Sequence, residues 1–103
     1  MAVRVKTFKA VTVATAGQRK PLSDSSILVY SATVQSLRTN TGYQYIGDST
    51  VTSDNGQEFG PSDTVSADGP PSSRGQEQYD LADIFVDSST DGAEFRISAW
   101  IRV

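Results

Sequence analysis

The last eleven residues of the chain alternate strictly between two kinds of side chain. In residues 93–103 the apolar side chains share one parity, and the polar or charged ones share the other, which also holds Trp100. A period of two is typical of a strand with one buried and one solvated face. Other short runs rich in Val, Ile, Thr and aromatic residues are separated by turn-forming residues, and no run has a helical period. The sequence therefore predicts an all-β fold.

The length of 103 residues allows one domain with one core. We predict a single antiparallel β-sandwich or jelly-roll-like domain over residues 1–103, with about seven or eight short strands in two sheets. The expected strands cover residues 3–14, 26–37, 43–47, 50–52, 64–67, 79–87 and 93–103.

Local signals refine this picture. The first strand should contain a bulge or break near Phe8, because Thr7 and Lys9 interrupt its apolar parity. A Thr-Asn-Thr-Gly turn predicts a hairpin over residues 32–47. Residues 68–78 contain two Pro, two Gly and no apolar residue, so we expect an exposed flexible loop there.

Composition excludes most enzyme mechanisms. The chain has no cysteine and no histidine, which removes disulfides, thiolate metal sites, cysteine nucleophiles and the usual general base. Asp83 and Asp87 would lie about 13 Å apart along a strand, too far to share an ion. No phosphate-binding loop is recognisable. We therefore predict a protein that is not an enzyme and has no catalytic, cofactor-binding or metal-binding residues.

The charges are unevenly distributed. The net charge is −3, which argues against a nucleic-acid partner. Arg4, Lys6 and Lys9 make residues 1–9 a basic N-terminal extension, whereas the first acidic residue is Asp24. This segment is either a solvated strand face or a contact strip for an acidic neighbour. No signal peptide is visible, and no apolar run approaches the roughly 20 residues of a membrane span, so we expect a soluble protein made in the cytoplasm.

Aromatic residues supply further candidate contacts. Trp100 shares the polar parity of the last strand with Arg102, and its ring either lies at an edge where flanking loops cover it or contacts a partner. Tyr43 and Tyr45 form either a cross-strand aromatic pair or, with Trp100, a platform on which a sugar stacks. The candidate interface residues are therefore Arg4, Lys6, Lys9, Tyr43, Tyr45, Trp100 and Arg102.

Four stretches of the chain resemble a family of small structural proteins of tailed bacteriophages. They are VTVATAGQRKPLS (11–23), SATVQSLRTNTGYQYIGDSTVTSDNG (31–56), FGPSDTVSAD (59–68) and YDLADIFVDSSTDGAEFRISAWI (79–101). The similarity lies in the order and spacing of VTV-TAG-PLS, NTG-YIGDS with a following Gly-Pro turn, and DL-DI-VD before a last strand. It covers about nine-tenths of the chain, and residues 1–9 and 68–78 depart from it.

The resemblance implies a β-sandwich virion component without catalytic residues or cofactors. Proteins of this kind often decorate or cement a capsid, commonly as trimers. The implied partners are the major capsid protein or other virion proteins and further copies of the chain, but neither nucleic acid nor a membrane. The implied location is the virion, after assembly in the host cytoplasm. A neck or tail position is an alternative, and the residues themselves also leave open a carbohydrate-binding module.

Overall fold

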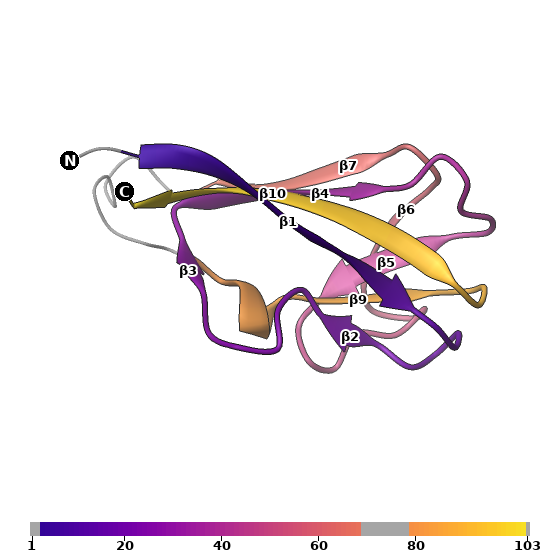
Figure 1. The fold of residues 1–103 in the computed structure, drawn as a ribbon. Coiled ribbons are helices and arrows are strands. Elements are labelled where there is room, and N and C mark those ends of the chain that lie inside the picture. Colours follow the sequence, from indigo (N-terminus) through magenta and orange to yellow (C-terminus); the bar gives the residue numbers. More distant parts are fainter. Residues whose placement is uncertain (1–2, 69–78, 103) are drawn as a thin grey trace.

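A computed structural model describes residues 3–68 and 79–102, and for Val3, Ala67, Asp68 and Arg102 it describes the backbone alone. Eight strands form two four-stranded antiparallel sheets that pack together, which confirms the predicted all-β sandwich class (Figure 1). Sheet I has the order β1-β10-β4-β7, with strands Val3–Val13, Ala93–Arg102, Ser31–Ser36 and Thr64–Asp68. Sheet II has the order β2-β9-β5-β6, with strands Lys20–Pro21, Phe85–Ser88, Gln44–Gly47 and Gln57–Phe59. Two short strands, β3 (Leu28–Val29) and β8 (Tyr79–Asp80), pair separately, and the 3₁₀ helix Leu81–Asp83 follows β8.

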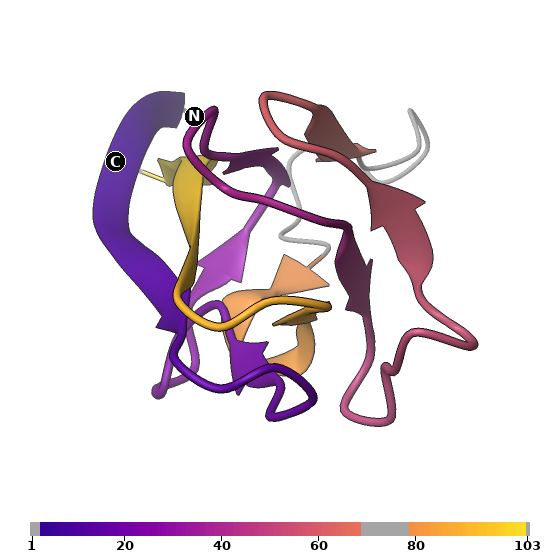
Figure 2. The ribbon, with the colours of Figure 1, turned by 90° about the vertical axis from the view of Figure 1, so that its right-hand side faces the viewer.

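The strands pair like one long hairpin folded over on itself. Leaving β3 and β8 aside, the first of the eight strands pairs with the last (β1 with β10), and the second pairs with the seventh (β2 with β9). The third pairs with the sixth (β4 with β7), and the fourth pairs with the fifth (β5 with β6). This nested order, split between two facing sheets, is the jelly-roll arrangement. Figure 2 looks along the strands and shows the two sheets end-on.

The hydrophobic core fills the space between the sheets. Alternate residues of β10 point into it, and Phe95 and Ala99 are completely buried, as the alternating pattern predicted. Phe59 of sheet II packs against Phe95 of sheet I with ring centroids 6.0 Å apart. The buried cluster comprises Val13, Leu22, Val29, Ala32, Val34, Phe59, Leu81, Val86, Ala93, Phe95, Ile97 and Ala99. Burial of each large apolar side chain of this kind contributes about 1.5–3 kcal/mol, so this cluster is the main stabilising element.

A bulge in β1 confirms the predicted irregularity near Phe8. The register with β10 shifts between Phe8 and Val11, so that Lys9 and Ala10 occupy a place where β10 has one residue, Arg96. The extra residue reverses the parity of the strand. Phe8 and Val11 therefore both pack against the core, although their sequence parities differ.

Residues 3–9, which the sequence suggested as an extension, form the first part of β1. Residues 3–8 pair one by one with β10, so the basic side chains here sit on the outermost strand of sheet I. Of the expected loop at residues 68–78, only the backbone of Asp68 is described, at the end of β7, and residues 69–78 lie outside the described residues. Within the described chain, no helix is long and apolar enough to cross a membrane.

The predicted hairpin over residues 32–47 is wrong. β4 pairs with β10 and β7 in sheet I, whereas β5 pairs with β6 and β9 in sheet II, so the intervening loop crosses from one sheet to the other. The reason is visible in side chains that a solvated hairpin would not bury: Ser36, Asn40 and Gln44 are all buried and bonded to one another.

Three other expected strands also differ. The strand at 26–37 divides at Tyr30 into β3 and β4, because β3 pairs with β8 rather than joining sheet I. Residues 50–52 form part of a loop, since Val51 packs onto the outside of sheet II instead of pairing in it. The stretch at 79–87 contains β8 and β9 with the 3₁₀ helix between them.

Candidate binding surface

Loops cover the outer face of sheet II. Tyr45 lies on this face, because the adjacent Ile46 packs against the core, yet Tyr45 is only 6% exposed. Val51 of the β5–β6 loop is 1% exposed and lies so close to Gly56 that a Cβ added there would be 2.4 Å from Val51 Cγ2. Burial, followed by the nearby carboxylates of Glu58 and Asp87, raises the pKa of Tyr45. The outer face of sheet II thus belongs to a second, smaller packed layer.

The loop between β1 and β2 closes the remaining part of that face. The Gly17 N–H donates a hydrogen bond to Asp87 Oδ1 (3.1 Å), and the Ala16 N–H donates one to Asp91 Oδ1 (2.8 Å). Arg19 Nε donates to the carbonyl of Ser49 and so joins the two covering loops. The central strands of sheet II, β5 and β9, therefore have no exposed residue, whereas Lys20, Gln57 and Glu58 of the edge strands are exposed.

The outer face of sheet I is open by comparison. Val5 of β1 stands directly opposite Trp100 of β10, and these side chains are 54% and 37% exposed. Next to this pair, one row of hydroxyl residues crosses all four strands in register: Thr7, Ser98, Thr33 and Ser66. Side chains directly opposite on neighbouring strands have Cβ atoms about 5 Å apart, so the row is continuous.

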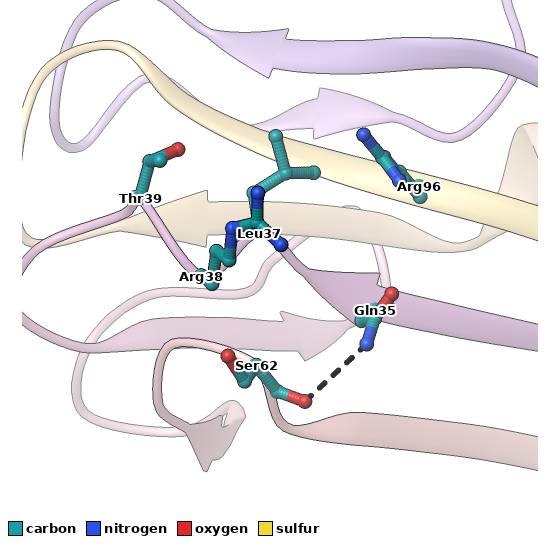
Figure 3. A pocket seen from close by; sticks show the side chains of 6 residues that line it. All are labelled: Gln35, Leu37, Arg38, Thr39, Ser62 and Arg96. Carbon is teal, nitrogen blue, oxygen red and sulfur yellow. Dashed lines mark hydrogen bonds between the residues drawn. The ribbon is translucent and has the colours of Figure 1, made fainter.

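Two joined hollows lie beside this row. One, of about 530 Å³, is lined by residues of β1, β10, β4 and β7, including Thr33, Gln35 and Arg96. The other, of about 420 Å³, shares Gln35 and Arg96 and adds Leu37, Arg38, Thr39 and Ser62 (Figure 3). Its side chains come from β4, β10, the loop after β4 and the turn before β7. We call the second hollow the arginine hollow.

A buried polar network holds the loop that carries Arg38. Asn40 Nδ2 donates hydrogen bonds to Ser36 Oγ (2.9 Å) and to the Glu94 carbonyl (2.8 Å), and its Oδ1 accepts one from the Glu94 N–H (2.9 Å). Ser36 Oγ donates to Gln44 Oε1, and Gln44 Nε2 donates to the Thr41 carbonyl. No buried side-chain nitrogen or oxygen of the described residues lacks a partner. The wall of the hollow is therefore preorganised.

The opposite wall is a tight turn with an unusual residue. In the turn Gly60–Asp63 the Asp63 N–H donates to the Gly60 carbonyl, and Pro61 precedes Ser62, whose φ is +70°. That position of a type II turn favours glycine, because a side chain there is strained. The Ser62 N–H donates to the Ser36 carbonyl, and Gln35 Nε2 donates weakly to the Ser62 carbonyl at 3.5 Å (Figure 3).

Two guanidinium groups dominate the electrostatics of the arginine hollow. Arg38 and Arg96 both line it, and among the residues that the structure describes no acidic one does. Neither guanidinium group has a hydrogen bond or ion pair with any other described residue. In a chain with a net charge of −3, two unpaired cations facing one hollow form a positively charged site.

Comparison with protein-family models, curated proteins and solved structures finds no match to this chain.

The structure brings some predicted interface residues together. Arg4, Lys6 and Lys9 are all exposed on β1. Arg4 and Lys6 pair with Ile101 and Ala99, so their side chains leave the sheet on its core side, and Lys6 Nζ lies 5.7 Å from the centre of the Phe8 ring. They stay exposed because β1 is the edge of sheet I, and its first half extends beyond β2 (Figure 1).

The three proposed stacking rings do not form one platform. Tyr45 is buried, whereas Tyr43 is 58% exposed and hydrogen-bonded to Ser89 through its backbone, beyond the far end of β10 from Trp100. Arg102 follows Trp100 at the end of β10, and its side chain is not among those described.

The acidic residues have structural contacts. Asp80 accepts hydrogen bonds from Ser26 Oγ and the Ala82 N–H, and these bonds lower its pKa. Bonds from the Thr50 hydroxyl and N–H likewise lower the pKa of Asp48. Among the described residues no group of three or more acidic side chains is arranged to hold a metal ion.

Sequence reasoning missed Arg38, Arg96, Gln35 and Ser62. Each of them is a polar residue beside a predicted turn or on the solvated face of a strand. Polar residues are so frequent at such positions that they do not identify a site. The one sharper signal was Gly60-Pro61-Ser62, where a non-glycine residue occupies the third position of a turn.

Proposed function

We propose that this chain is a non-enzymatic structural protein of a tailed-bacteriophage virion, which coats the capsid as a decoration or cement subunit. Its partners are then the major capsid protein and further copies of itself, as a trimer. The sequence resemblance is the reason for proposing a virion protein. The observation that supports a binding role is the edge of sheet I, where β1 carries three exposed cations and the exposed Val5–Trp100 pair lies on the outer face.

Each part of this edge suits a protein contact. Trp and Arg are enriched at the centres of interfaces. A partner that covers this edge can bury the apolar pair on the outer face, while the cations of the edge strand select an acidic surface. A different explanation is that Arg4, Lys6 and Lys9 only prevent edge-to-edge aggregation, which charged residues on edge strands commonly do. The two explanations predict different effects of removing the charges.

The test must leave β1 in place. Deletion of residues 2–9 would strip β10 of six paired residues and remove Phe8 from the edge of the core, so it would disrupt the sheet as well as remove the charges. The double substitution Arg4→Gln with Lys6→Gln removes two charges at one end of the strand. Lys20→Gln with Arg38→Gln is the matched control, since it also removes two exposed charges and both residues lie outside β1.

Co-sedimentation with capsids that lack the protein measures the outcome. We expect the wild type and the control to bind shells in hundreds of copies, and the β1 variant and Trp100→Ser to bind weakly while keeping their melting temperatures. If the β1 variant binds shells fully but aggregates when free, the charges of β1 only prevent edge-to-edge aggregation, and the capsid contact lies elsewhere.

Copy number also separates the capsid from the neck or tail, which is the alternative position. A ring at the neck or tail would hold about a dozen copies or fewer, so quantitative mass spectrometry of purified particles decides between the two. Light scattering on the free protein tests the trimer.

A further inference from the structure

The arginine hollow lies on the same surface as the hydroxyl row, at the end of the sheet away from the Val5–Trp100 pair. Arg96 and Trp100 lie four residues apart on the same face of β10, which places them about 13 Å apart. The two joined hollows at the Arg96 end have volumes of about 420 and 530 Å³, large enough for several sugar rings in sequence. This end of the sheet can therefore act independently of the proposed capsid contact.

The chemistry of the lining specifies the charge of the ligand. Of the described residues that line the arginine hollow, Arg38 and Arg96 are the charged ones, and both guanidinium groups are without a partner in the described chain. Guanidinium groups bind carboxylates through paired, charge-assisted hydrogen bonds. The loop that presents Arg38 is fixed by the buried Asn40 network, so little conformational entropy is lost when an anion binds.

The uncharged lining residues favour a sugar chain over a peptide as the ligand. Hydroxyl and amide groups from Thr33, Ser98 and Gln35 project from the face of the sheet, not from its edge. A peptide lying across a sheet face would leave most of its backbone N–H groups without acceptors, and for this reason extended peptides bind at sheet edges. A sugar chain carries hydroxyl groups on all sides, which side chains of this type can satisfy.

The strained serine adds an independent indication. Ser62 keeps a side chain at φ +70°, where glycine would be favoured, and that residue lines the arginine hollow. Strain of this kind concentrates at binding sites.

We propose that the joined hollows on the outer face of sheet I, lined by Arg38, Arg96, Gln35 and the hydroxyls of Thr33 and Ser98, bind an acidic polysaccharide through its carboxylate and hydroxyl groups.

Affinity gel electrophoresis tests the proposal, with polygalacturonic acid in the gel as the probe, dextran as the neutral glycan and poly-L-glutamate as the acidic peptide. We expect polygalacturonic acid alone to retard the wild type. Arg38→Gln and Arg96→Gln should each weaken the affinity about tenfold or more, because each removes a charged hydrogen-bond donor pair. Thr33→Val, which removes a hydroxyl without a charge, should weaken it a few-fold.

The matched control is Arg4→Gln, which removes the same charge at the other end of the sheet and should leave the retardation unchanged. Thermal melts verify that each variant is folded. Equal retardation by poly-L-glutamate, with no effect of Thr33→Val, would mean that the site recognises carboxylates without a sugar and would overturn the proposal. Absence of retardation by polygalacturonic acid, or an equal loss in Arg4→Gln, would overturn it as well.

Discussion

Replacing Asn40 by alanine tests whether the loop that carries Arg38 is held by a buried polar network. The Asn40 side chain is 9% exposed and makes three hydrogen bonds, of 2.9, 2.8 and 2.9 Å, to Ser36 and to both backbone groups of Glu94. Asn40→Ala removes all three, so that Ser36 loses a buried donor, the Glu94 N–H loses this acceptor, and the Glu94 carbonyl keeps only the Leu37 N–H (3.2 Å) of its two loop donors. The variant should therefore lose stability and loosen the wall of the arginine hollow.

The expected loss follows from the number of bonds. A hydrogen bond contributes about 1 kcal/mol net, and an abandoned buried partner costs about 1–3 kcal/mol, so the free energy of unfolding should fall by at least about 3 kcal/mol. For a domain of this size that lowers the melting temperature by roughly 12–24 °C. Urea denaturation followed by tryptophan fluorescence should show the midpoint falling by about 1–3 M.

The control is Asn55→Ala in the β5–β6 loop. Asn55 also accepts from one N–H, of Thr52 (2.8 Å), and donates to one carbonyl, of Thr50 (3.1 Å), but it is exposed, so water replaces the lost bonds. We expect it to cost less than about 1 kcal/mol. If the two variants lose equal stability, or if Asn40→Ala loses less than about 1 kcal/mol, burial does not strengthen the network and the argument for a preorganised hollow fails.

Three further predictions concern single turns. Ser62→Gly should stabilise the protein by about 0.5–1 kcal/mol, because relief of the strained left-handed backbone outweighs the added freedom of the unfolded chain. Ser62→Ala should not stabilise it, because alanine keeps the strain. Equal denaturation midpoints for the two variants would contradict this. The hydrogen bond from Ser26 helps hold the pKa of Asp80 below its ordinary value, so this carboxylate stabilises the fold at neutral pH, and that contribution disappears as the pH falls through the folded pKa, below about 4. Asp80→Asn should therefore flatten the fall of the melting temperature below pH 4, and an unchanged acid profile would refute the assignment. Gly56→Ala should destabilise by about 1–3 kcal/mol in thermal melts, because its Cβ would lie 2.4 Å from Val51 Cγ2, and a neutral result would mean that the loop over sheet II is loosely packed.

The features of the fold that were predicted correctly are those that a local sequence pattern determines. The alternation of residues 93–102 determines which face of β10 is buried, and the misplaced polar residues around Phe8 mark the bulge in β1. Both signals act within a few residues of the element they describe, so no knowledge of distant partners was needed.

The parts that failed depend on which sheet a strand joins. The Thr-Asn-Thr-Gly sequence predicts that the chain reverses after β4. It does not indicate whether the next strand pairs with β4 or crosses to the other sheet. The deciding residues are Ser36, Asn40 and Gln44, whose buried side chains bond to one another as the chain crosses from sheet I to sheet II. The arginine hollow could not be predicted for a similar reason, because Arg38 and Arg96 are brought to one hollow only by the pairing of β4 with β10.

Strand length explains why the open surface belongs to sheet I. Its central and edge strands β10 and β1 have 10 and 11 residues, so long stretches of chain are used in pairing. In sheet II, β2 and β6 have only two and three residues, and the unpaired chain beside them forms loops that must bury apolar side chains such as Val51. Those loops find their nearest apolar surface on the outside of their own sheet, around Tyr45. The same division of the chain that covers sheet II therefore leaves the cations, Trp100 and the hydroxyl row of sheet I free to bind.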